Sequence, residues 1–148
     1  MDSKQIKFLT IAISLLLLFI SLTQDAIVVN YSGEVRNDSA LGYFLIGAIA
    51  FLGGGLFEEI IWLANPLCLL AIIYFLKNNE KAVLLSLIAS GLTISFAFWS
   101  EILGAESGAM AKIVSFGLGY YLWASSILVL TTGILLNYKM SLKESLQS

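Results

Sequence analysis

Two adjacent glutamates, Glu58 and Glu59, lie in the middle of a long apolar stretch and are the first candidates for chemistry. The segment GGGLFEEIIWLANP covers residues 53–66, and these glutamates are the only charged residues between positions 39 and 76. A carboxylate at membrane depth is costly unless it is paired, protonated or hydrated. The pair therefore predicts either a cation or proton site or the first turn of a helix, where a carboxylate favours the positive end of the helix dipole.

Two further carboxylates, Asp25 and Glu101, also lie within apolar surroundings, and none of the predicted spans contains a Lys or Arg to pair with them. Together with Glu58 and Glu59 they predict an acidic, outward-facing cluster that binds or conducts cations or protons. Carboxylates that cluster raise one another's proton affinity. The alternative is that Asp25 and Glu101 mark the ends of helices at the level of the lipid headgroups.

Two tryptophans accompany these carboxylates in the sequence. Trp62 follows Glu58 by four residues, so a helix places the two side chains on one face. Trp99 precedes Glu101 by two residues. Tryptophans of this kind anchor a helix at the membrane interface, or they recognise a ligand or partner. Trp123 lies within the last apolar run and is expected to pack against a neighbouring helix.

Several kinds of chemistry are excluded by the residues that the sequence lacks. It contains no histidine, and Cys68 is its only cysteine. Ser-His and Cys-His catalysis, an intramolecular disulfide and ordinary zinc sites are therefore absent. We predict no cofactor, no metal site and no enzymatic activity. The net charge is -2 and there is no basic cluster, so no nucleic-acid partner is expected.

The composition is that of an integral membrane protein. Of 148 residues, 59% are hydrophobic and 12% are charged, and a soluble domain carries about 25% charged residues. The apolar runs are long and continuous, as in transmembrane helices, whereas barrel strands alternate in character. The sequence predicts an all-α integral membrane protein with one helical domain, residues 1–148, in the bilayer of a bacterial cytoplasmic membrane.

The apolar run at residues 39–76 is too long for a single crossing. As one helix it would extend about 57 Å, against a hydrocarbon core of about 30 Å. The three glycines at positions 53–55 are the expected break. This predicts a short re-entrant or interfacial helix at 39–52, capped by Asp38 or Ser39, followed by a crossing. The expected crossings are residues 8–29, 57–76, 82–104 and 113–138.

The alternative treats the same run as a hairpin of two spans, which gives five transmembrane helices. The positive-inside rule favours the bundle of four. Four crossings place six basic residues on the cytoplasmic side and two outside, whereas five crossings give five against three. The four-crossing bundle puts both chain ends in the cytoplasm. The six cytoplasmic residues are Lys4, Lys7, Lys77, Lys81, Lys139 and Lys143, and the two outer ones are Arg36 and Lys112.

Small residues recur four positions apart in two of the expected spans. Ser86 and Ser90 form one such pair, and Ser115 and Gly119 form another. This spacing allows close approach of helix backbones and interhelical hydrogen bonds. It predicts packing within the chain or, alternatively, self-association or contact with a protein partner.

Two functional hypotheses follow. The first is a small non-enzymatic membrane protein that binds a partner within the bilayer, as a subunit of a complex or as an immunity-type factor against a membrane-active toxin. The second is an oligomeric cation or proton channel or transporter that uses the acidic cluster. The first is preferred because the chain has packing motifs and little mass outside the membrane, but no catalytic constellation.

Overall fold

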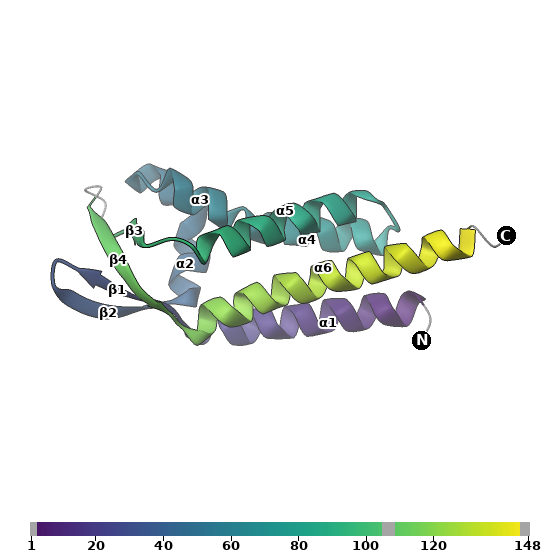
Figure 1. Cartoon of the computed structure of the whole chain (residues 1–148), viewed down its shortest axis with the longest axis horizontal. Helices are drawn as coiled ribbons and strands as arrows, with labels where there is room; N and C mark the ends of the chain where they lie inside the picture. Colours follow the sequence, from purple (N-terminus) through teal and green to yellow (C-terminus); the bar gives the residue numbers. More distant parts are fainter. Residues whose placement is uncertain (1–2, 105–108, 146–148) are drawn as a thin grey trace.

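The molecule is a bundle of helices with a small β-sheet at one end (Figure 1). The computed structural model describes residues 3–104 and 109–145. The helices are α1 (Ser3–Ser21), α2 (Ala40–Ile46), the 3-10 helix η1 (Gly47–Gly53), α3 (Leu56–Trp62), α4 (Ala64–Leu76), α5 (Lys81–Phe96) and α6 (Leu118–Ser145). The strands are β1 (Asp25–Tyr31), β2 (Glu34–Ser39), β3 (Glu101–Leu103) and β4 (Met110–Phe116).

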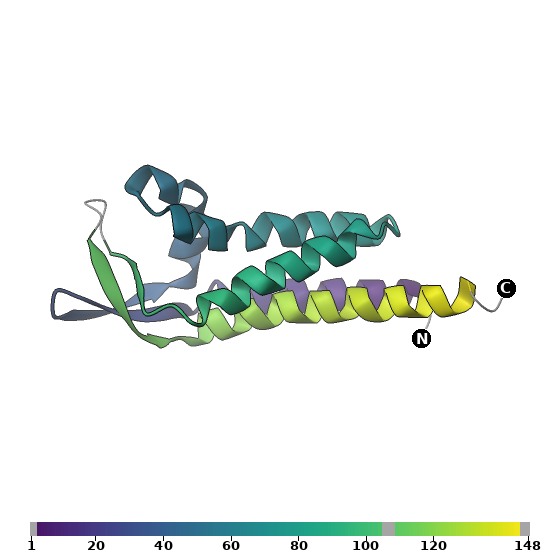
Figure 2. The ribbon, with the colours of Figure 1, turned by 45° about the horizontal axis from the view of Figure 1, so that its top comes forward.

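Four helices, α1, α4, α5 and α6, lie side by side along the length of the molecule (Figures 1 and 2). α1 packs along α6, α4 packs along α5, and α5 packs on α6. The start of α1, the α4–α5 turn and the last turns of α6 lie at one end of the bundle. The four strands with α2, η1 and α3 lie at the other, which we call the sheet end.

Three stretches of helix are long and apolar enough to cross a membrane: α1, Leu56–Leu76 and Leu118–Leu142. α5 is also apolar but shorter, with 16 residues. Large apolar side chains cover the outside of the bundle, among them Phe8, which is 77% exposed, and Phe19, which is 63% exposed. Apolar surface on this scale is suited to lipid rather than water. The structure thus supports the helical membrane class predicted from composition.

The interior of the bundle is built from small and hydroxyl side chains. The Ser90 and Thr131 hydroxyls lie 2.8 Å apart, and Thr131 Oγ1 also donates to the Ser86 carbonyl at 3.1 Å, so α5 and α6 are joined by hydrogen bonds. On the opposite side of α6, Gly133 lies directly against Thr10 of α1. Lipid provides no hydrophobic force between helices, so close packing and interhelical hydrogen bonds hold such a bundle together.

Two β-hairpins combine into one antiparallel sheet with strand order β2-β1-β4-β3. The β1–β2 turn has Ser32 and Gly33 at φ 53° and 94°, as the two-residue hairpin turns with positive φ at both positions require. The central pair, β1 and β4, joins the chain after α1 to the chain before α6. Its buried residues Ile27, Val29 and Ala111 form a core with Ile102 of β3.

The sheet contradicts the prediction of an all-α protein. The expected first span at 8–29 ends as a helix at Ser21 and continues as β1. The expected spans 82–104 and 113–138 likewise include β3 and most of β4. These strands were missed because AIVV and AKIVSF are apolar enough to extend a predicted helix. A short apolar run does not distinguish helix from strand by periodicity alone.

The run from residue 39 to 76 breaks at the glycines, as predicted. Ser39 Oγ accepts a hydrogen bond from the Gly42 amide and caps α2. The chain turns at Gly54, whose φ of 91° suits glycine. α2 and η1 stay at the sheet end beside α3, and α4 then runs along the bundle (Figures 1 and 2). The segment predicted to form one short helix therefore forms two, α2 and η1.

The contact between α1 and α6 is tested by Gly133→Ala. A Cβ at Gly133 would lie 2.2 Å from the side chain of Thr10, whereas one at Gly91 of α5 meets nothing within 4 Å. Overpacking should lower the free energy of unfolding in detergent micelles by about 1–3 kcal/mol. Gly91→Ala, the control, should be neutral or stabilise by up to about 1 kcal/mol through helix propensity.

The free energy of unfolding of both variants is measured by circular dichroism during a denaturant titration. Thr10→Ala in the Gly133→Ala background should recover part of the loss, because it removes two of the crowded atoms. Equal stability of Gly133→Ala and Gly91→Ala would contradict the close approach of α1 and α6.

Candidate functional site

A pocket of about 1060 Å³ lies where the sheet end meets the bundle. One wall is made by α2, η1 and α3, and the other by β1, β2, β3 and the first turns of α6. Most of its lining is apolar or aromatic, including Phe44, Phe96 and Tyr120, and its polar side chains come mainly from β2 and α3. The volume is at the upper end of small-molecule sites, which span about 300–1,000 Å³. The pocket is therefore a candidate binding site for a small molecule or an apolar segment.

Glu58 and Trp62 line this pocket from neighbouring turns of α3. Glu58 Oε1 accepts a hydrogen bond from the backbone amide of Leu103 at 2.9 Å. This bond joins α3 to the edge strand β3, so the glutamate holds two walls of the pocket together. Glu58 lies in the first turn of its helix, as the sequence allowed, where the helix dipole favours a carboxylate.

The indole rings of Trp62 and Trp123 are both held by hydrogen bonds. Trp62 Nε1 donates to the Phe44 carbonyl at 2.8 Å, and Trp123 Nε1 donates to Asn65 Oδ1 at 2.9 Å. Asn65 Nδ2 donates in turn to the Trp62 carbonyl at 3.0 Å. Pro66 lies in the first turn of α4, where its missing N–H leaves no helical bond unmade. Asn65 therefore links the Trp123 indole to the backbone of Trp62.

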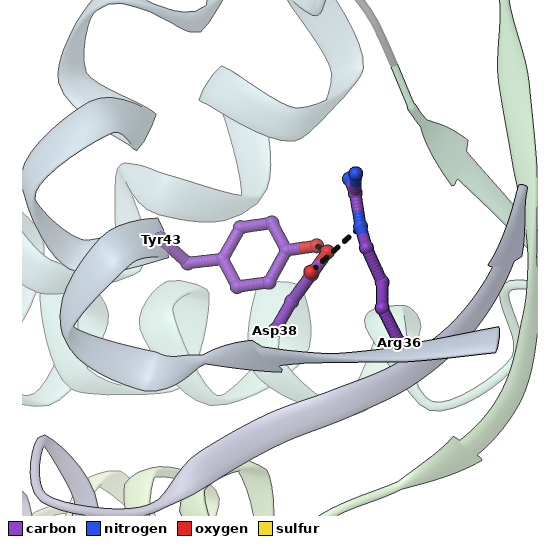
Figure 3. A network of polar contacts seen from close by, with 3 residues as sticks. All are labelled: Arg36, Asp38 and Tyr43. Carbon is purple, nitrogen blue, oxygen red and sulfur yellow. Dashed lines mark hydrogen bonds and ion pairs between the residues drawn. The ribbon is translucent and has the colours of Figure 1, made fainter. Parts of the chain in front are cut away.

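A small polar network stands at the edge of the pocket formed by β2 and α2 (Figure 3). Arg36 Nε lies 3.0 Å from Asp38 Oδ1, and the Tyr43 hydroxyl donates to Asp38 Oδ2 at 2.7 Å. The Arg36 side chain is 50% exposed and that of Asp38 is 21% exposed. Burial and then the hydrogen bond to Asp38 raise the pKa of Tyr43, so its hydroxyl stays protonated as a donor.

Sequence reasoning missed this network and the part played by Trp123 and Asn65. The sequence was interpreted with Arg36 as an outer basic residue and Asp38 as a possible helix cap, although their spacing of two residues places both on one face of a strand. An Asn-Pro pair inside an apolar run was the available signal for Asn65. Only the fold shows that β2 and α6 face the same pocket.

The other predicted site residues lie outside the pocket. Asp25 is exposed at the start of β1 and accepts a hydrogen bond from Asn37 Nδ2 at 3.0 Å. Glu101 is exposed in β3, opposite Lys112 of β4. Glu59 is half-buried on α3, and the Trp99 ring packs edge-on against Phe96 at 5.3 Å.

The four carboxylates therefore do not line one common cavity, and Glu58 alone of them faces the pocket. Within residues 3–104 and 109–145, no three Cys, Asp or Glu side chains come together as metal ligands. The pocket offers hydrogen-bonding groups, one cation and two carboxylates beside an aromatic wall, which is a surface for binding.

The small residues expected at helix contacts are mostly used within the chain. Ser86 and Ser90 contact α6, as described above. A Cβ on Gly119 would lie 2.8 Å from the Asp25 carbonyl oxygen, and Ser21 Oγ donates to the Gly119 carbonyl at 2.7 Å. Ser115 is exposed on β4. Gly119 thus lets α6 begin directly beside the start of β1.

Comparison of the chain with protein-family models, curated proteins and solved structures finds no match. The properties of the pocket therefore rest on its own residues. The hydrogen-bonded indoles of Trp62 and Trp123 help to preform this cavity. The hydrogen bond from the Leu103 amide to Glu58, which we call the Glu58–β3 clasp, does the same.

The clasp is tested by Glu58→Ala, which leaves the Leu103 amide without its acceptor. The loss should destabilise β3 locally by about 1–2 kcal/mol. Hydrogen exchange at the Leu103 amide should then rise by about five- to thirtyfold.

Glu58→Gln should keep the protection, because its amide oxygen still accepts the bond. Glu59→Ala is the matched control on the adjacent residue and should leave Leu103 unaffected. Unchanged exchange in Glu58→Ala would show that the carboxylate does not hold β3.

Proposed function

We propose that this chain is a small non-enzymatic integral membrane protein that binds a partner in the pocket at its sheet end. The observation that carries the proposal is the pocket itself, a cavity of about 1060 Å³ with an aromatic wall and a polar edge. Such a combination binds the apolar part of a partner and orients it through a few polar groups. A role as a complex subunit or an immunity-type factor uses binding of this kind.

We propose four crossings, made by α1, the α3–α4 segment, α5 and α6. α5 is the shortest, at about 24 Å, but three further backbone hydrogen bonds of the i to i−3 type continue its apolar path to Trp99. It packs between α4 and α6, both parts of segments long enough to span. A short crossing is accommodated by local thinning of the bilayer.

The orientation follows from the basic residues. Lys4 and Lys7 begin α1, Lys77 and Lys81 flank the α4–α5 turn, and Lys139 lies in the last turns of α6. All five lie at the end opposite the sheet. The positive-inside rule assigns that end, with both termini, to the cytoplasm. The sheet end and its pocket then face the outer surface of the membrane.

The walls of the pocket support a binding role because they are fixed before any partner arrives. Trp62, Trp123 and Glu58 each have a hydrogen-bond partner that sets the side-chain position. Preorganised walls reduce the entropy lost on binding. α2 and η1 also expose large apolar residues that do not line the pocket, including Leu45 and Phe51, which are 64% and 51% exposed. This apolar surface supports a position of the pocket beside lipid.

The topology is tested with single cysteines in a Cys68→Ala background. Glu34→Cys in β2 and Gly53→Cys should react with an impermeant thiol reagent from outside the cell, and Glu80→Cys should not. Gly53 is suitable because a Cβ there meets nothing closer than 3.9 Å. Reaction of Glu34→Cys from the cytoplasmic side, with Gly53→Cys still reacting from outside, would favour five crossings and contradict the proposal.

Pocket binding is tested in a Trp99→Phe variant, where the remaining tryptophans, Trp62 and Trp123, both line the pocket. A maltoside detergent with a brominated alkyl chain should quench their fluorescence when its chain enters. Ala50→Phe fills part of the pocket and should lower the quenching. Ala12→Phe on the exposed face of α1 is the control and should not. Equal quenching in both variants would show that the alkyl chain of the detergent does not bind in the pocket.

A further inference from the structure

The polar edge of the pocket combines one cation and one carboxylate that each retain bonding capacity. We propose that the pocket binds a phospholipid of the outer leaflet whose headgroup carries both a phosphate and a primary ammonium, with Arg36 contacting the phosphate and Glu58 the ammonium. The inference rests on the proposed pocket function and names the chemical class of the ligand.

Arg36 supplies the site for the phosphate. Its Nε is engaged by Asp38, whereas its two terminal nitrogens have no partner among the described residues. These nitrogens point away from Asp38 into the space between β2 and the helices (Figure 3), and Arg36 lines the pocket. Asp38 thus holds the guanidinium in place while leaving its outer edge open. That edge presents paired N–H donors, the geometry that suits phosphate oxygens.

Glu58 supplies the site for the ammonium. Its Oε1 is used by the Leu103 amide, and Oε2 has no hydrogen bond with any described residue. Glu58 and Arg36 are both close enough to the Tyr43 hydroxyl to influence its pKa, in opposite directions. Both side chains line the same pocket, which therefore offers a guanidinium and a carboxylate to one ligand. A headgroup with a phosphate and an ammonium on a two-carbon link presents the complementary pair of charges.

The balance of charge separates this headgroup from an anionic one. Arg36, Asp38 and Glu58 together carry a formal charge of about -1 at neutral pH. A lipid with a phosphate and no ammonium would bring its negative charge to two carboxylates and one guanidinium. Like charges disfavour binding and opposite charges favour it. The ammonium removes this imbalance.

The remainder of the pocket suits the acyl chains. Beyond the polar edge, its lining continues through Ile61, Trp62 and Phe96 to Trp123. The wall formed by α2 and η1 exposes Leu45 and Phe51, which do not line the pocket, at 64% and 51%. Such a wall is in contact with lipid, so the molecule that meets the pocket most often is itself a lipid. The two polar groups at its edge then select among headgroups.

The experiment uses the Trp99→Phe protein in nanodiscs of phosphatidylglycerol. Three tracers with the same brominated acyl chains are added in turn at equal mole fraction: phosphatidylethanolamine, phosphatidylglycerol and diacylglycerol. Quenching of Trp62 and Trp123 reports occupancy of the pocket. We expect apparent affinity for the phosphatidylethanolamine tracer to exceed that for phosphatidylglycerol by about two- to fivefold. Both phospholipids should exceed diacylglycerol.

The two charges are separated by matched variants. Glu58→Gln keeps the bond to Leu103 and should abolish the preference for phosphatidylethanolamine over phosphatidylglycerol, whereas Glu59→Gln should retain it. Arg36→Gln should remove the preference of both phospholipids over diacylglycerol. Lys112→Gln, which changes an exposed cation outside the pocket, should leave that preference unchanged.

Equal quenching by the three tracers would overturn the headgroup inference, as would a preference for phosphatidylglycerol. If the brominated detergent still discriminates Ala50→Phe from Ala12→Phe in that case, the pocket binds an apolar segment without selecting a headgroup. A failure of the headgroup inference is thereby distinguished from a failure of pocket binding.

Discussion

The pairing of β1 with β4 is the interaction on which the sheet end depends. It joins residues 25–31 to residues 110–116, so the chain that leaves α1 is fastened to the chain that enters α6. The Gly117 amide donates to the Ala26 carbonyl at 2.7 Å, and a Cβ at Gly117 would lie 2.3 Å from the Asp25 carbonyl oxygen. Two hairpins that would be marginal alone become one sheet with a buried core.

The pocket follows from that pairing through a short series of contacts. β4 holds β3, and the Leu103 amide of β3 is bound by Glu58 of α3. α3 is thereby fixed over the sheet, and its Trp62 indole binds the end of α2 through the Phe44 carbonyl. In the described chain, no fully buried side-chain nitrogen or oxygen lacks a hydrogen-bond partner. A region with little water requires this completeness, because an unsatisfied polar group there is costly.

The proposed function uses the contrast between the two ends of the molecule. The bundle exposes apolar side chains on its surface and joins its helices through small hydroxyl residues. The sheet end carries most of the acidic residues and the pocket, with Arg36 and Glu58 at its polar edge. A cavity that passes from aromatic residues to charged ones has the polarity gradient that a lipid headgroup and its acyl chains have. Binding there needs no catalytic group.

Much of the helical body could be predicted from local sequence. Long apolar runs indicate membrane helices because partition into lipid depends on composition along a segment. The break at residues 53–55 and the cap at Ser39 were also predictable, since glycine conformations and helix capping are local. The position of Glu58 in the first turn of a helix, with Trp62 one turn later, followed from the same reasoning.

The sheet and the membership of the site were decided only by tertiary structure. AIVV and AKIVSF fit either a helix or a strand locally, and they become strands because their backbone groups pair with each other across more than eighty residues. That pairing brings Arg36 and Trp123 to the pocket and leaves Asp25 and Glu101 outside it. The sequence alone determined which segments are apolar and where the chain turns. Hydrogen bonds between distant segments determined which side chains share a cavity. Such bonds cannot be predicted from the local sequence around either of the two paired segments.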